Sequence, residues 1–277
     1  MQITTKIQIN GGETVYYIGK TDIGKKRETN QDNFLTMRVC DNITMFVLCD
    51  GMGGTNGGNI ASSLAIRTFA DHVEQALSPY IDAEDICDTA KVSFPDLINE
   101  AVSASNKAVY RRARESSELT NMGTTIVAAI ATDNEIHIAN VGDSLMYLIE
   151  GKALTQLTHD HSYVQMLVDM GQLTKEEAAT NPRRNILTRA VGTEPTVDAD
   201  VITVDMPDEG SYFILCSDGL YNFISEKEMV NIVRKKYRDY DDDDYDAELT
   251  FKTELLVDTA NQNGGGDNIT IILIKNV

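Results

Sequence analysis

The chain of 277 residues is poor in basic residues, with 24 Lys and Arg against 43 Asp and Glu, so its formal net charge is −19. This shortage argues against nucleic acid or an anionic membrane as a partner, because phosphate contacts need a basic surface. No apolar run approaches the roughly 18 residues of a membrane-spanning helix. Surplus Asp can also hold metal ions, so the positions of the aspartates matter.

Cysteine is scarce as well, and no C-x-x-C pair occurs among Cys40, Cys49, Cys87 and Cys216. Three of the four lie in or beside apolar runs, which predicts buried free thiols. The start, MQITTKIQING, lacks the apolar segment of a signal peptide, and no linker rich in Pro, Gly or Ser divides the chain. We therefore expect one domain over residues 1–277, monomeric and cytoplasmic.

Strand-like and helical patterns are both present, without the βαβ alternation of a doubly wound fold. Expected strands cover 15–21, 34–39, 43–50, 124–132, 135–142, 144–150 and 268–277, and expected helices cover a segment ending near 77, about 94–117, 226–237 and 246–262. Capping boxes at Thr174 with Glu177 and at Ser225 with Glu228 predict two helix starts. The breaks DNE and GDS are interpreted as hairpin turns. The pattern predicts an α+β fold, with a central antiparallel β-sandwich flanked by helices on both outer faces.

Aspartate recurs at four corners that flank apolar strands: Asp50, Asp143, Asp218 and Asp267. Any one of them is explained as a turn, since Asp and Gly favour turns. If the strands lie side by side in a sandwich, however, the corners converge. Two carboxylates about 4 Å apart repel by roughly 4 kcal/mol at an effective dielectric near 20. Divalent cations relieve this repulsion, and oxygen-only ligands favour Mg²⁺ or Mn²⁺ over zinc.

Two further stretches admit a functional and a structural interpretation. Gly51 follows Asp50 in DGMGGTNGG, where a residue without a side chain allows its carbonyl to approach a metal; a simple glycine turn is the alternative. Arg27 stands five residues before Asp32 in TDIGKKRETNQDNF. Arginine binds phosphate through two donors, although a surface arginine is the plainer interpretation.

Other candidates carry less weight. The H-x-H pair His159 and His161 is more typical of a turn than of a ligand set. The acidic run RDYDDDDYDAE (238–248) lacks the Gly and Glu of a calcium loop, so we expect a solvated loop there, including its Asp-rich part 239–246.

Eight stretches together resemble a known family, the metal-dependent protein phosphatases of type 2C, and in particular its compact bacterial members. In chain order they are TDIGKKRETNQDNF (21–34), VLCDGMGG (47–54), MGTT (122–125), IANVGDSLMY (138–147), LTHDHS (157–162), NILTRAVG (185–192), LCSDGL (215–220) and GGGDNITIIL (264–273). The similarity spans about residues 13–275. It implies a sandwich with a dinuclear Mn²⁺ or Mg²⁺ centre at one end.

The resemblance also implies a role for each matching residue. Asp50 would bridge both metals, the carbonyl of Gly51 would bind the first, and Asp218 and Asp267 would hold the second. Asp143, with Asp218, would form a weaker third site.

Two more residues would act on water and substrate. Asp32 matches the acid that orients a metal-bound water, and Arg27 matches the arginine that holds the substrate phosphate. The implied reaction is hydrolysis of phosphoserine and phosphothreonine in proteins, by in-line attack of a metal-bridging hydroxide. The partners would be phosphorylated proteins, the substrates of a cytoplasmic Ser/Thr kinase.

The chain departs from the family pattern at several positions. Met52 stands where many members carry a histidine that protonates the leaving group, so the general acid is open, with a metal-bound water as a candidate. Gln31 replaces a Glu of some members, and Leu145 replaces a frequent Arg. Residues about 162–186 correspond to the family's flap, where Arg183 and Arg184 are either substrate contacts or a structural pair.

A rival hypothesis is a catalytically inactive phosphatase fold used as a binding or signalling module. Such proteins lose metal carboxylates, whereas this chain keeps the aspartates at all four corners.

Overall fold

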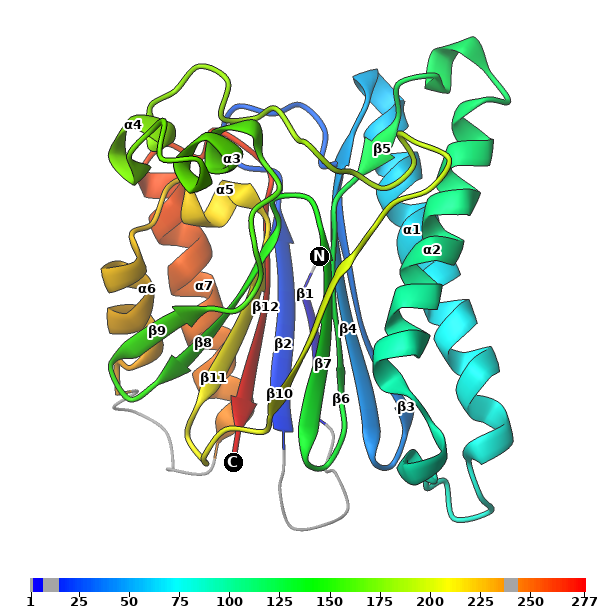
Figure 1. The fold of residues 1–277 in the computed structure, drawn as a ribbon. Coiled ribbons are helices and arrows are strands. Elements are labelled where there is room, and N and C mark those ends of the chain that lie inside the picture. The colour runs from blue at the N-terminus through cyan, green and yellow to red at the C-terminus, as the bar shows by residue number, and fades with distance from the viewer. Residues whose placement is uncertain (1, 7–14, 237–243) are drawn as a thin grey trace.

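The computed structural model describes residues 2–6, 15–236 and 244–277, and it confirms the α+β sandwich with helices on both outer faces (Figure 1). The strands are β1 (Gln2–Lys6), β2 (Val15–Asp22), β3 (Asp32–Cys40), β4 (Ile43–Met52), β5 (Gly123–Thr124), β6 (Ile126–Ala131), β7 (Glu135–Val141), β8 (Leu145–Glu150), β9 (Ala153–Gln156), β10 (Asp200–Asp205), β11 (Tyr212–Cys216) and β12 (Ile269–Asn276). The helices are α1 (Gly54–Leu77), α2 (Phe94–Ala113), α3 (Tyr163–Asp169), α4 (Lys175–Ala179), α5 (Asp218–Tyr221), α6 (Glu226–Val233) and α7 (Tyr245–Gln262), with short 3₁₀ turns at Ser78–Tyr80, Thr89–Lys91 and Ser117–Leu119.

Two antiparallel sheets form the centre of the molecule. The first has the strand order β1-β2-β12-β11-β8-β9, and the second has the order β10-β7-β6-β4-β3, with β5 paired to β4. Helices α1 and α2 cover the second sheet, and α6 and α7 cover the first (Figure 1). Strands distant in sequence, such as β2 and β12, are therefore neighbours.

The apolar core lies in three layers that follow from this arrangement. One lies between the sheets and includes Phe46, Leu48 and Phe213. The other two lie between each sheet and its helices. Because the central strands are covered on both faces, they are continuously apolar rather than alternating, as in ITMFVLC of β4. All four cysteines are free and buried, as predicted.

One of the two predicted hairpins is wrong. The DNE break joins β6 to β7, which pair antiparallel as expected. The GDS break instead carries the chain from β7 in one sheet to β8 in the other. Two apolar runs around a turn have the same local pattern in both cases, so the sequence does not reveal the change of sheet. The consequence is that Asp143 lies where the two sheets meet.

Two helices end earlier than predicted. Helix α2 stops at Ala113 rather than near 117, because residues 114–117, RESS, supply no apolar side chain for the inner face. Helix α6 stops at Val233. Both capping boxes are confirmed: Thr174 and Ser225 accept from the backbone N–H of Glu177 and Glu228, respectively.

The acidic run was expected to be a loop over 238–248, with its Asp-rich part at 239–246. Residues 238–243 lie outside the described part of the chain. From Asp244 onward the expectation is wrong, since the Asp244 carboxylate caps α7 by accepting from the Ala247 N–H at 3.1 Å. Acidic side chains at a helix start are favoured by the helix dipole, and Asp246 and Glu248 occupy the first turn.

Candidate metal centre

The four aspartate corners converge, as predicted, at the end of the sandwich that carries α5 and β5 (Figure 1). Asp50 lies near the end of β4, Asp143 follows β7, Asp218 begins α5, and Asp267 precedes β12. They line one cavity of about 410 Å³. Arg27, Gln31, Gly51, Met52 and Asn268 are among the other residues that line it.

Asp50 and Asp218 form the negative centre of this cavity. Burial raises the pKa of both carboxyls well above the usual range, and the charges of neighbouring aspartates raise it further. One oxygen of Asp218 accepts from the Asn222 side chain at 3.2 Å, whereas the other, Oδ1, is buried and makes no hydrogen bond within the described part of the chain. A buried carboxylate oxygen without a partner is costly unless a cation binds it. The pair therefore fits a divalent metal.

Asp143 extends the acidic surface toward a second cavity. Burial, and then the charge of Asp160, raise the pKa of Asp143 to about 7. Its backbone carbonyl accepts from the Tyr221 hydroxyl at 2.9 Å. Asp143, Asp160 and Asp218 also line an adjoining cavity of about 260 Å³ beside the segment 162–186. Asp160 was missed from the sequence, although it lies within the quoted stretch LTHDHS.

Asp32 lies directly opposite Asp50 in the pairing of β3 with β4. Its Oδ2 accepts from the hydroxyls of Ser217, at 2.8 Å, and Thr270, at 2.7 Å. Its Oδ1 is buried and accepts no hydrogen bond from any described residue. Burial raises the pKa of Asp32 to about 6 despite the two hydroxyl donors, which act to lower it. One oxygen is thus fixed by two hydroxyls, and the other is buried without a donor.

Arg27 donates to the Asp267 carboxylate at 2.7 Å. The arginine side chain is half exposed, at 51%, so it can also reach a ligand in solution. Within the described ranges, no three Asp, Glu, His or Cys side chains close into a metal cage. The Arg27 ion pair holds one of the four carboxylates, that of Asp267. Oxygen donors of this kind still match Mg²⁺ and Mn²⁺.

Gly51 lines the cavity, but the structure gives a different reason for the glycine. A Cβ at this position would lie 2.1 Å from the backbone oxygen of Gly58 and 2.7 Å from that of Gln31. No side chain fits between the end of β4 and the first turns of α1. The glycine is therefore required by packing, whatever its carbonyl binds.

Asn268 is a second residue missed from the sequence, although it directly follows Asp267. Its Oδ1 accepts from the Gln31 N–H at 2.9 Å, and its Nδ2 donates to the carbonyls of Ile23 and Thr29, each at 3.0 Å. This side chain fixes both sides of the loop that carries Arg27. A GDN triplet gives no indication of that role, because the partners are about 240 residues away.

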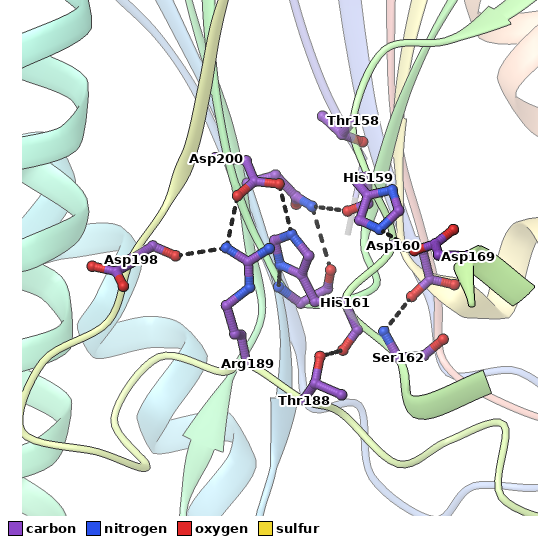
Figure 2. A network of polar contacts seen from close by, with 12 residues as sticks. Thr158, His159, Asp160, His161, Ser162, Asp169, Thr188, Arg189, Asp198 and Asp200 are labelled. Carbon is purple, nitrogen blue, oxygen red and sulfur yellow. Dashed lines mark hydrogen bonds and ion pairs between the residues drawn. The ribbon is translucent and has the colours of Figure 1, made fainter. Parts of the chain in front are cut away.

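The histidine pair is not arranged as a ligand set, in agreement with the sequence interpretation. His161 is buried, and its two ring nitrogens contact the Gly142 N–H and the Asp200 carboxylate, each at 3.0 Å (Figure 2). The exposed ring of His159 lies 3.0 Å from Asp169 instead. No ring nitrogen of His161 is free for a metal.

The remaining departures are placed as follows. Met52 lines the central cavity, and the Gln31 amide donates to the carbonyl of Gly54 at 2.8 Å. Leu145 is buried in the core between the first sheet and its helices. Arg183 contacts the ring and hydroxyl of Tyr163, which favours a structural role, and Arg184 lines the adjoining cavity.

Comparison with known proteins agrees with this geometry. The family model for protein phosphatase 2C matches residues 19–251. A serine/threonine phosphatase stp of Listeria welshimeri is 36% identical over 256 residues, which cover 92% of this chain and 94% of that protein. A serine/threonine phosphatase structure from S. agalactiae superposes with a TM-score of 0.80 at 31% identity, covering 94% and 99% of the two chains.

A third similar structure is the catalytic domain of the serine/threonine protein phosphatase PstP, determined in complex with two manganese ions. It has a TM-score of 0.77 at 27% identity and covers 96% of this chain and 99% of that one. Both the family model and the relatives span most of the sequence. This chain belongs to the protein phosphatase 2C family.

Proposed function

We propose that this protein is a Mn²⁺- or Mg²⁺-dependent phosphatase that hydrolyses phosphoserine and phosphothreonine in proteins. The observation that carries the proposal is the convergence of Asp50, Asp143, Asp218 and Asp267 on one cavity with Arg27 as a cation at its edge. An inactive binding module would have no need to keep this repulsive cluster. Its retention supports an enzyme.

The metal ligands are assigned from the family resemblance, and the cavity that the four aspartates line supports the assignment. We assign Asp50 and the Gly51 carbonyl to the first metal, and Asp50, Asp218 and Asp267 to the second. Asp143 with Asp218 would hold a weaker third ion. Metals held by these residues would lower the pKa of a water, so that it could act as a nucleophile, and would stabilise negative charge on the phosphoryl group.

Arg27 is assigned to the substrate phosphate. Its ion pair with Asp267 shows that the guanidinium reaches the cavity. With the Asp267 carboxylate held by a metal, the Arg27 guanidinium would be free to bind two phosphoryl oxygens. Asp32 is assigned to the attacking water, because no donor among the described residues reaches its Oδ1, while Ser217 and Thr270 hold the other oxygen.

The leaving alkoxide must take its proton from a donor other than Met52. The thioether of Met52 carries no acidic proton. We assign this step to solvent water in the open cavity.

The biological context belongs to the same proposal. The substrates would be phosphoproteins made by a cytoplasmic Ser/Thr kinase, and the protein would act in signalling as a monomeric, single catalytic domain with residues 162–186 as its flap. Support comes from relatives named as protein phosphatases and from the single continuous sandwich. Among the described residues, no helix is both long enough and apolar enough to cross a membrane.

The test is hydrolysis of a phosphothreonine peptide with added Mn²⁺ and with EDTA. We expect activity that requires Mn²⁺ and a loss of roughly 100-fold or more for Asp218→Asn with the fold intact by circular dichroism. Asp258→Asn, on the exposed side of α7, is the matched control. Full activity of Asp218→Asn, or no Mn²⁺ binding by the wild type, would contradict the proposal.

A further inference from the structure

His161 is a buried imidazole in which both ring nitrogens are used. Nδ1 accepts from the Gly142 N–H at 3.0 Å, so the ring proton is on Nε2, which donates to Asp200 at 3.0 Å (Figure 2). The histidine is therefore neutral, and burial also lowers its pKa. Burial alone would raise the pKa of Asp200, but hydrogen bonds from Arg189 and His161 outweigh this effect and lower it. The contact is a directed hydrogen bond from a neutral ring to a carboxylate.

The same histidine holds Gly142 from both sides. Besides the bond to the ring, the Gly142 carbonyl accepts from the His161 backbone N–H at 3.0 Å. Gly142 has a φ of 110°, a conformation available to glycine, and it turns the chain between the two sheets. The next residue is Asp143, whose own carbonyl is held by Tyr221. The direction of the Asp143 carboxylate thus depends on the fixed Gly142 peptide.

His161 also fixes the base of the segment 162–186. Its carbonyl accepts from the backbone N–H of Thr188, at 2.7 Å, and from the Thr188 hydroxyl, at 2.8 Å. Ser162 forms a β-bridge with Leu187 next to it. On the other side of the ring, Asp200 of β10 is bound by Arg189 at 2.7 Å (Figure 2). One residue therefore joins the Asp143 turn, both ends of this segment and the second sheet.

We propose that His161 is a positioning residue. It fixes the turn that carries Asp143 relative to the ends of the segment 162–186, and so determines how tightly the aspartate-lined cavity binds divalent metal. The inference rests on the proposed function, because it takes Asp143 as a metal ligand. It concerns a side chain that touches neither metal nor substrate.

Three variants separate the two hydrogen bonds of the ring. In His161→Asn, the amide oxygen can take the place of Nδ1 and still accept from Gly142. In His161→Gln, the amide reaches the place of Nε2 and keeps only the contact with Asp200. His161→Ala loses both. The matched control is His137→Ala, which removes another buried histidine whose Nδ1 bonds Thr203, also between β7 and β10.

Mn²⁺ binding is measured by isothermal titration calorimetry, and the Mn²⁺ concentration for half-maximal peptide hydrolysis is measured in parallel. We expect His161→Ala and His161→Gln to lower the Mn²⁺ affinity about tenfold and to raise the half-maximal Mn²⁺ concentration by the same factor, as for other residues that orient a metal site. For His161→Asn, both quantities should stay within about threefold of the wild type. His137→Ala should lower the melting temperature without changing Mn²⁺ affinity. Equal Mn²⁺ affinity in all variants, or an Asn variant as weak as the Ala variant, would overturn the proposal.

If His161→Ala does not fold, Asp200→Ala provides a second test, because the Asp200 side chain is 40% exposed and its removal leaves no internal cavity. It should weaken Mn²⁺ binding about threefold, and an unchanged affinity would count against the proposal. A wild type without Mn²⁺-dependent hydrolysis would refute the proposed function itself. An active wild type with unshifted variants would refute only the role of His161.

Discussion

For single residues in the cavity, the sequence predicts the positions of the aspartates. It does not predict the side chains that hold them in place. The four aspartates were found because each is next to Gly in a corner that flanks an apolar strand. The two hydroxyls that hold Asp32 come from Ser217 and Thr270, which are 185 and 238 residues away. Pairings at such separation depend on the order of strands in the sheets. A single sequence does not encode that order locally.

Arg27 provides a test at the scale of one side chain. We expect Arg27→Ala to lower kcat/KM for a phosphothreonine peptide about 30-fold, equal to about 2 kcal/mol, because charge-assisted bonds to phosphate are lost. The kcat/KM of Arg27→Lys should lie between those of Arg27→Ala and the wild type, since lysine keeps the charge without the two-donor geometry. Mn²⁺ affinity should not weaken, because the arginine competes with metal for Asp267.

The control for this prediction is Arg38→Ala, which removes an arginine on β3 that pairs with Asp41 and Asp85 away from the cavity. Its steady-state kinetics should match the wild type. If Arg27→Ala left KM and kcat unchanged, phosphate binding by Arg27 would be excluded.

At the scale of elements, α7 is attached to the first sheet by a buried ionic network. Glu248 bonds Lys252 of the same helix, Tyr212 of β11 and Lys275 of β12. Burial would raise the pKa of Glu248, but these partners outweigh it and lower the value to about 2. The predicted helix over 246–262 is confirmed as α7, which begins one residue earlier, at Tyr245. Its attachment could not be predicted, because neither lysine carries a sequence signal for burial.

We therefore expect Glu248→Gln to reduce the free energy of unfolding by about 3 kcal/mol at neutral pH, since Lys252 is left buried without its anion. The contribution of Glu248 should be complete above its unfolded pKa near 4.5 and disappear as pH falls through about 2. Urea unfolding of both proteins between pH 7 and pH 2 measures the difference.

Glu254→Gln is the matched control on the same helix, because Glu254 is 47% exposed and lies 3.7 Å from Lys20. It should change the free energy of unfolding by less than about 1 kcal/mol. A difference for Glu248→Gln as small as this, or one that grew as the pH fell, would show that the network does not stabilise the fold.

On the scale of the whole molecule, the sandwich was predictable, whereas the passage from sheet to sheet at Gly142 was not. The layers follow from apolar runs too continuous for strands with one face in water. The arrangement brings the corners together and so concentrates negative charge. Asp32, Asp50, Asp143 and Asp218 all have pKa values raised by burial, to about 6 for Asp32 and about 7 for Asp143.

The metal-free protein should consequently lose stability as pH rises from about 4 to 7. Over this range the folded state binds more protons than the unfolded state. Each carboxyl whose pKa is raised by folding therefore makes the folded state less stable as the pH rises from its unfolded pKa toward its folded pKa. Mn²⁺ at about 100 times its Kd should restore about 2.7 kcal/mol at pH 7.5. Urea unfolding in EDTA and in Mn²⁺ at several pH values measures both effects. Stability in EDTA that rose between pH 5 and 7 would contradict the account.

The central claim is that the corners of the sandwich hold the catalytic metals. Anomalous diffraction from crystals grown with Mn²⁺ tests it most directly. We expect two strong Mn²⁺ peaks bounded by Asp50, Asp218 and Asp267, with the Asp267 carboxylate moved from Arg27 to the metal. Crystals of active enzyme in millimolar Mn²⁺ with no peak in this cavity, or with peaks only elsewhere, would contradict it.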